Sequence, residues 1–169
     1  SKSTGASQLH SVTCIAQDRR AGKTSTWYFG TGEFRGNSAT GGGGAFYTGD
    51  GIYKSTNGGT SWAVLSATST GNPHSWENPF DYVFSLATDP VSSSDIVYAA
   101  VPMGIRRSTD GGATWGWTLG AFNGVNPRYT DIVASPTGVL YAALSEVSVN
   151  GDTTTALGGI YRSTNGTAW

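Results

Sequence analysis

Charged residues are scarce in this chain of 169 residues: they make up 12%, with 10 Lys and Arg against 11 Asp and Glu. The formal net charge of −1 gives no electrostatic basis for binding nucleic acid or an anionic membrane surface. No apolar run approaches the roughly 20 residues of a membrane-spanning helix. We therefore expect no nucleic-acid partner and no membrane span.

Cysteine and histidine are equally rare. The single cysteine, Cys14, excludes an intrachain disulfide and lies in an apolar stretch, which is typical of a small core residue. His10 and His74 are far apart, and no Cys/His spacing fits zinc. We expect no metal and no cofactor. Calcium is the alternative that Asp50-Gly51 and Asn150-Gly-Asp152 leave open, although neither loop has a full ligand array.

Glycine and aromatic residues, by contrast, are abundant. The chain has 25 glycines and 12% aromatic residues, including six tryptophans. Aromatic and β-branched residues favour strands, and disordered chains are poor in aromatics. The composition therefore predicts an all-β protein rich in turns.

One segment of the sequence occurs three times, at Gly51–Trp62, Gly104–Trp115 and Gly159–Trp169. The copies begin 53 and 55 residues apart, and the third is one residue shorter between its Ser and its Trp. Each is preceded by two short runs rich in Val, Ile, Tyr and Phe that are bounded by turn residues, which are strand and hairpin signals. A unit of four antiparallel strands at this period is typical of a β-propeller blade.

The whole chain, 1–169, is thus predicted to form part of one β-propeller, with blades at 9–66, 80–119 and 129–169, the last incomplete. Propellers use about four to eight blades, so we expect about three blades of a larger propeller. The predicted partners are the remaining blades or domains of the same polypeptide; association of separate arcs is the alternative.

The repeated segment contains Ser-Thr-Asn/Asp-Gly, in which the Asn or Asp side chain can accept hydrogen bonds from backbone N–H groups of its own turn. Ser55–Trp62 and Ser108–Trp115 match S-x-[DN]-x-G-x-[ST]-W at every position. This pattern resembles the Asp-box, or BNR, repeat of the sialidase-like propeller superfamily. The resemblance implies a structural role for Ser55, Asn57, Gly59, Trp62, Ser108, Asp110, Gly112, Trp115, Ser163, Asn165 and Trp169.

The first blade resembles, more closely, large secreted bacterial BNR-repeat proteins of the kind exported by type IX secretion. The resemblance is carried by Trp27–Glu33, Gly36–Ser38 and Gly44–Tyr47, followed directly by the first repeated segment. It implies a secreted or cell-surface bacterial protein. Since the chain begins at Ser1 without a signal peptide, we expect a mature or excised segment.

Strand parity predicts that the repeated turns lie at one end of the blades and the long connections at the other. Long loops on a rigid scaffold are where binding residues concentrate. Aromatic rings beside carboxylates and amides suit sugar binding. The candidate ligand-binding residues are Arg35, Tyr47, Trp76, Glu77 and Arg128; the alternative is that they only pin the loops to the scaffold.

A glycosidase needs two carboxylates about 5–9.5 Å apart, and the candidates are Glu33, Asp50 and Glu146. The sialidase family's Arg-Ile-Pro motif is absent, and no recognisable arginine triad occurs. We therefore interpret the chain as a binding or scaffold module, for a glycan or a surface protein, of a larger secreted or cell-surface protein. The alternative is a sialidase-like or xyloglucanase-like glycoside hydrolase completed by other blades.

Overall fold

The computed structural model describes residues 11–36, 45–73, 75–120, 129–145 and 158–169, with side chains left undescribed at 35, 36, 45 and 46. In this part of the chain, antiparallel strands predominate, and the one helical element is a short 3-10 helix, η1 (Pro79–Asp81). No described helix is long and apolar enough to cross a membrane. The all-β prediction is confirmed.

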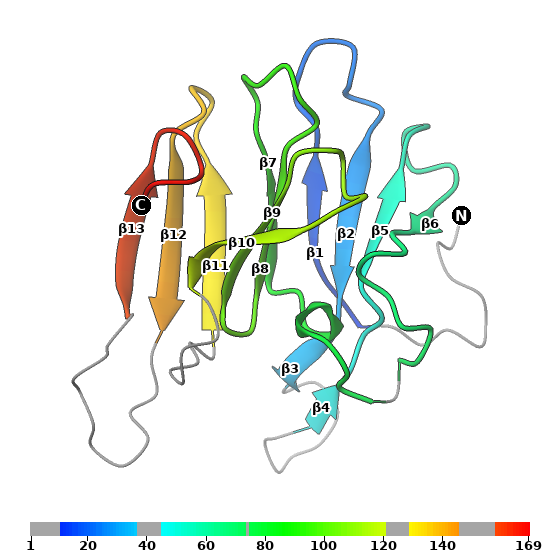
Figure 1. Cartoon of the computed structure of the whole chain (residues 1–169). Helices are drawn as coiled ribbons and strands as arrows, with labels where there is room; N and C mark the ends of the chain where they lie inside the picture. Colours follow the sequence, from blue (N-terminus) through cyan, green and yellow to red (C-terminus); the bar gives the residue numbers. More distant parts are fainter. Residues whose placement is uncertain (1–10, 37–44, 74, 121–128, 146–157) are drawn as a thin grey trace.

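Two sheets have four strands and one has three (Figure 1). Sheet 1 has the order β1-β2-β5-β6, sheet 2 the order β10-β9-β8-β7, and sheet 3 the order β11-β12-β13. Their strands are β1 (Val12–Gln17), β2 (Trp27–Thr31), β5 (Ile52–Ser55), β6 (Ala63–Val64), β7 (Ser85–Thr88), β8 (Val97–Val101), β9 (Gly104–Ser108), β10 (Gly116–Gly120), β11 (Tyr129–Ala134), β12 (Leu140–Ser145) and β13 (Gly159–Ser163).

The three sheets pack face to face with their first strands side by side: β1 and β11 both lie against β7 (Figure 1). Two hydrophobic clusters fill the spaces between them. One, around Tyr28 and Ile52, lies between sheets 1 and 2. The other, around Tyr98 and Ile105, lies between sheets 2 and 3. Each sheet is therefore stabilised mainly by burying a face against its neighbour.

The repeated segments form tight turns between the third and fourth strand positions. In the first turn, Ser55 Oγ accepts from Gly59 N at 2.9 Å and donates to Asn57 Oδ1 at 2.9 Å. Asn57 Oδ1 also accepts from Ser61 N at 3.0 Å. The second turn repeats this network around Ser108 and Asp110. The predicted hydrogen bonding of these turns to their own backbone is confirmed.

The shortened third turn differs in its tryptophan. Trp62 and Trp115 each donate from Nε1 to a glycine carbonyl of their own turn at 3.1 Å. Trp169 Nε1 instead donates to Thr118 Oγ1 on β10 of sheet 2 at 3.2 Å. The missing residue thus redirects this indole to the neighbouring sheet.

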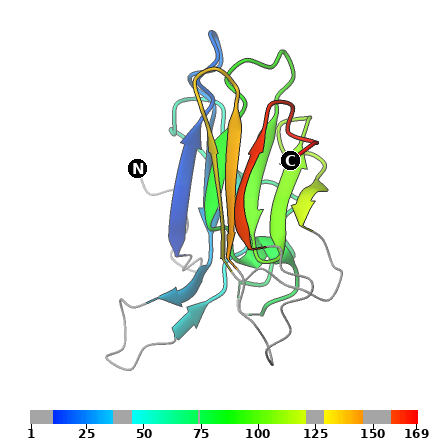
Figure 2. The same cartoon turned by 90° about the vertical axis from the view of Figure 1, so that its left-hand side faces the viewer.

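The two ends of the sheets carry different connections, as strand parity predicts (Figure 1). The turn end comprises residues 18–26, 89–95 and the repeated turns. The loop end comprises η1 with its flanking segments and a small hairpin, β3 (Glu33–Gly36) and β4 (Ala45–Tyr47). Figure 2 shows this hairpin projecting beyond the sheets. The long connection between β2 and β5 thus contains two short strands, where the sequence predicted a loop.

Candidate ligand-binding site

Five aromatic rings meet at the loop end of the three sheets. Phe34 of β3 lies at the centre, with ring centroids 5.1 Å from Tyr82, 5.8 Å from Tyr129, 6.2 Å from Phe84 and 6.5 Å from Trp76. All four contacts are edge-on, with interplanar angles of 70–78°, a favoured geometry for aromatic pairs. We call these five residues the aromatic cluster.

The cluster joins segments that are far apart in sequence. Phe34 comes from the hairpin of sheet 1, and Trp76, Tyr82 and Phe84 from the connection between sheets 1 and 2. Tyr129 is the first residue of β11 in sheet 3. Tyr82 is 3% exposed, whereas Trp76 is 52% and Tyr129 39% exposed. The cluster therefore has a buried base and an open rim on which a ligand can stack.

A buried carboxyl group holds the exposed tryptophan in place. Asp81 is fully buried, and its Oδ2 accepts hydrogen bonds from the backbone N–H groups of Glu77 at 2.6 Å and Asn78 at 2.8 Å. Asn78 Oδ1 in turn accepts from Phe80 N at 2.7 Å, which completes a capping box on η1. These bonds fix the segment that follows Trp76.

Asp81 also joins this segment to sheet 1. Its carbonyl oxygen accepts from Gly49 N at 2.8 Å. A Cβ on Gly32, where φ is 92°, would overlap that same carbonyl oxygen, so only glycine fits there. Burial removes water from this carboxyl group and raises the pKa of Asp81. Its Oδ1 has no hydrogen-bond partner among the described residues.

The candidate carboxylates occupy different settings. Glu33 lies opposite Tyr47 in the β3–β4 pair, and Tyr47 is 38% exposed. Glu77 is exposed and accepts from Asn72 Nδ2 at 2.8 Å. Both are next to a cluster residue along the chain, Phe34 and Trp76 respectively.

Asp50 has the contacts of a loop anchor. It is 6% exposed, and its Oδ1 accepts from Ser69 Oγ at 2.7 Å, Thr70 N at 3.0 Å and Gly71 N at 3.1 Å. Oδ1 of Asp50 therefore holds the loop to the scaffold. Pinning the loops in this way is the alternative role that the sequence left open for polar loop residues. Of the other candidates, Glu146, Arg128 and the side chain of Arg35 lie outside the described residues.

Sequence reasoning missed most of the aromatic cluster. Trp76 is the one member among the predicted ligand-binding residues; Phe34, Tyr82, Phe84 and Tyr129 are not among them. The signal was the alternation Tyr82-Val-Phe84 directly after a long connection. The first strand of the second blade begins at Ser85, since η1 and its cap precede it.

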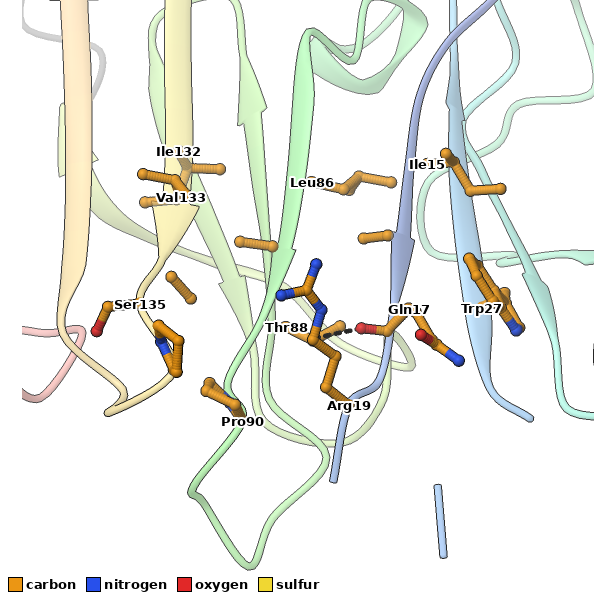
Figure 3. Close-up of a pocket in the computed structure, with 14 residues that line it drawn as sticks. Ile15, Gln17, Arg19, Trp27, Leu86, Thr88, Pro90, Ile132, Val133 and Ser135 are labelled. Atoms are coloured by element: carbon orange, nitrogen blue, oxygen red, sulfur yellow. Dashed lines mark hydrogen bonds between the residues drawn. The ribbon is translucent and has the colours of Figure 1, made fainter. Parts of the chain in front are cut away.

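A hollow of about 500 Å³ lies along the first strands of the three sheets (Figure 3). Ile15, Leu86 and Ile132 line its middle, and Arg19 and Trp27 lie nearer the turns. Thr88 Oγ1 donates to the carbonyl oxygen of Gln17 at 2.8 Å across it. No carboxylate lines it, and its lining residues include a single aromatic ring, that of Trp27.

The described residues contain no group of three or more His, Cys, Asp or Glu that could hold a metal ion. Cys14, the thiol of the chain, packs against the cluster between sheets 1 and 2. Burial raises its pKa to about 11, so the thiol is neutral at physiological pH.

No protein-family model and no curated protein matches the chain. Among solved structures, the chain is similar to an ancestral GH74 enzyme, with 28% identity and a TM-score of 0.58 over 82% of this chain. A GH74 enzyme of Niastella koreensis is similar over 89% of this chain, with 21% identity and a TM-score of 0.46. The chain spans 17% of the first enzyme's length and 28% of the second's.

GH74 enzymes are β-propeller glycoside hydrolases, and the likeness to the first one agrees with the four-stranded antiparallel sheets of this chain. The fold is a β-propeller. Sheets 1, 2 and 3 are its blades, and the aromatic cluster lies at one end of all three.

Proposed function

We propose that this chain is a glycan-binding part of an extracellular, Asp-box type β-propeller within a larger secreted or cell-surface bacterial protein. The observation that carries the proposal is the aromatic cluster, with Trp76 52% and Tyr129 39% exposed at its rim. Aromatic faces stack on the apolar faces of sugar rings, while nearby polar groups bond the hydroxyls. Type IX export of the whole protein belongs to the same proposal.

The favoured ligand is a neutral glycan. Glu77 is exposed and follows the exposed Trp76 directly in the chain. Carboxylates accept hydrogen bonds from sugar hydroxyls but repel a carboxylate on a ligand. Sialic acids and uronic acids are therefore disfavoured by this end of the blades.

The test compares two tryptophans at opposite ends of the molecule. Neutral and acidic glycans are screened on an array, and the best ligand is measured by calorimetry. Trp76→Ala is expected to weaken binding at least about tenfold, or 1.4 kcal/mol, because exposed aromatic anchors dominate such sites. Trp27→Ala is the matched control, because Trp27 lines the hollow along β1, β7 and β11. Loss of binding in Trp27→Ala alone, or an array without any bound glycan, would overturn the proposal.

The second candidate is a glycoside hydrolase, favoured by the 28% identity to an ancestral GH74 enzyme. Of the carboxylates predicted from the sequence, Glu33 fits this role better than Asp50, whose Oδ1 already accepts three hydrogen bonds. The two functions differ in product formation. Release of reducing sugar that Glu33→Gln abolishes, with glycan binding retained, would favour the hydrolase.

A further inference from the structure

The blade formed by sheet 2 has a very short connection between its second and third strands at the loop end. Only Pro102 and Met103 separate β8 from β9, whereas the equivalent connections are residues 32–51 in sheet 1 and 146–158 in sheet 3. In Figure 1 the β8–β9 turn stays close to its sheet, and Figure 2 shows β3 and β4 of sheet 1 projecting further. The middle blade therefore leaves room above this turn.

Met103 holds a backbone conformation that is unfavourable for its side chain. Its φ is 85°, and it is the one non-glycine residue with a positive φ among the residues that the structure describes. A proline followed by a residue with positive φ is the pattern of a type II turn, in which glycine usually takes this position. Glycine avoids the steric cost of a Cβ there. The chain has 25 glycines and one methionine, yet the methionine occupies this position.

The neighbouring strands hold the turn in this conformation. The carbonyl oxygen of Met103 lies so close to the end of β10 that a Cβ on Gly120 would overlap it. From β11, Thr130 Oγ1 donates to the carbonyl oxygen of Val101 at 2.9 Å, just before the turn. Strained backbone conformations persist where the surrounding structure fixes them, and they are concentrated at binding sites. Met103 is partly exposed, so burial in the core does not account for a methionine here.

The turn lies beside the aromatic cluster. Phe84 N donates to the carbonyl oxygen of Ala100 at 2.9 Å, and Tyr129 directly precedes Thr130, which bonds to Val101. These two cluster residues thus belong to the segments that flank the end of β8. Met103 is two residues beyond Val101 and is therefore next to the open rim of the cluster.

We propose that Met103 is a ligand-contacting residue of the glycan site. Its side chain contacts the apolar face of a sugar unit next to the unit that stacks on the aromatic cluster, so the ligand is an oligosaccharide and not a single sugar. A thioether side chain suits this role because it is apolar, flexible and polarizable. The inference rests on the proposed function, which supplies the glycan.

A direct test uses Met103 as its own reporter. Because the chain has one methionine, protein labelled at the methionine methyl group gives one NMR signal from this side chain. Titration with the neutral oligosaccharide that binds best on the array is expected to shift this signal, with a midpoint at the Kd measured by calorimetry. The corresponding monosaccharide is expected to leave the signal in place.

Substitutions separate a ligand contact from a packing role. Met103→Gly removes both the side chain and the strain, so we expect the affinity to fall about fourfold or more, as for the loss of roughly one buried CH₂ group. Its Tm is expected to be equal to or above that of the wild type. Met103→Leu keeps an apolar side chain and should bind within about twofold of the wild type. A residue kept for packing would instead give a Met103→Gly variant with a lower Tm and unchanged affinity.

Thr137→Gly is the matched control, because Thr137 is exposed in the turn between β11 and β12, at the opposite end of the blades. Its affinity for the oligosaccharide should equal that of the wild type. If the wild type binds the oligosaccharide but the methionine signal does not move, or if Met103→Gly binds as tightly as the wild type, this inference is overturned and the proposed function stands. A wild type that binds no glycan overturns both.

Discussion

The turn end of the first two blades is joined by one arginine, and replacing it gives a sharp stability prediction. Arg20 Nη2 lies 2.5 Å from Asp18 Oδ2 in its own turn and 2.6 Å from Asp95 Oδ1 in the corresponding turn of sheet 2. Its Nη1 also donates to the carbonyl oxygens of Ser92 and Ser94 at 3.1 and 2.7 Å. The guanidinium thus crosses the junction between blades.

The expected cost of Arg20→Ala follows from what the substitution leaves behind. The side chain of Asp18 is only 4% exposed, so its carboxylate would remain buried without a counter-charge. Removing one partner of a buried pair costs about 3–5 kcal/mol. The carboxylate of Asp95 is 38% exposed, so the loss of its ion pair with Arg20 adds little to this free-energy cost. We expect about 3 kcal/mol in the free energy of unfolding, or a fall of roughly 6–12 °C in Tm.

Urea unfolding followed by tryptophan fluorescence measures this change, with the slope against denaturant expected to stay the same. The neighbouring Arg19→Ala is the control, because Arg19 is exposed and should change stability by less than about 0.5 kcal/mol. Adding Asp18→Asn to Arg20→Ala should recover about 1–2 kcal/mol, since the buried charge is then gone. A loss below about 1 kcal/mol for Arg20→Ala, or no recovery in the double variant, would refute the reasoning.

Two further predictions concern pH. Burial raises the pKa of Asp81 in the folded state above its unfolded value of about 3.9. The folded state therefore binds the proton of this carboxyl group more tightly than the unfolded state does. The resulting contribution to the free energy of unfolding is present at low pH and is lost as the pH rises through the folded pKa. Urea titrations should show this fall in the wild type and not in Asp81→Asn, and equal slopes would contradict it. At Asp110 the sign is reversed: hydrogen bonds from Thr114 and Ser108 lower its pKa, so its stabilisation is present above about pH 3.9 and lost below it. Asp110→Asn should remove this loss of stability at acid pH. At pH 7 its free energy of unfolding should stay within about 1 kcal/mol of the wild type, because Asn57 and Asn165 make the same turn bonds. An unchanged loss of stability at acid pH would count against this prediction.

Much of the fold could be predicted from the sequence, because the interactions that determine it are local. The turn bonds around Asn57 and Asp110 span at most four residues. The apolar runs just before the second and third repeated segments form β8 and β12, each paired with the strand of the repeated segment that follows it. The cap of η1 also has a local sequence signal, Asn78-Pro79 followed by Asp81, although the sequence analysis did not predict this cap.

The candidate site was harder to predict because it depends on contacts between distant segments. Phe34 and Tyr129 are 95 residues apart in sequence, yet their ring centroids are 5.8 Å apart. Strand parity placed their segments at one end of the blades, but it gave no contact between them. The anchoring role of Asp50 could not be predicted for the same reason: its hydrogen-bond donors, Ser69 to Gly71, belong to a separate connection.

The central claim, that the aromatic cluster binds a glycan, is tested most directly by a crystal structure of the chain with a bound neutral oligosaccharide. The account predicts a sugar ring stacked on Trp76 at the loop end, with hydroxyl groups bonded to Glu33 or Glu77. A sugar bound instead in the hollow along β1, β7 and β11, with the aromatic cluster empty, would contradict it.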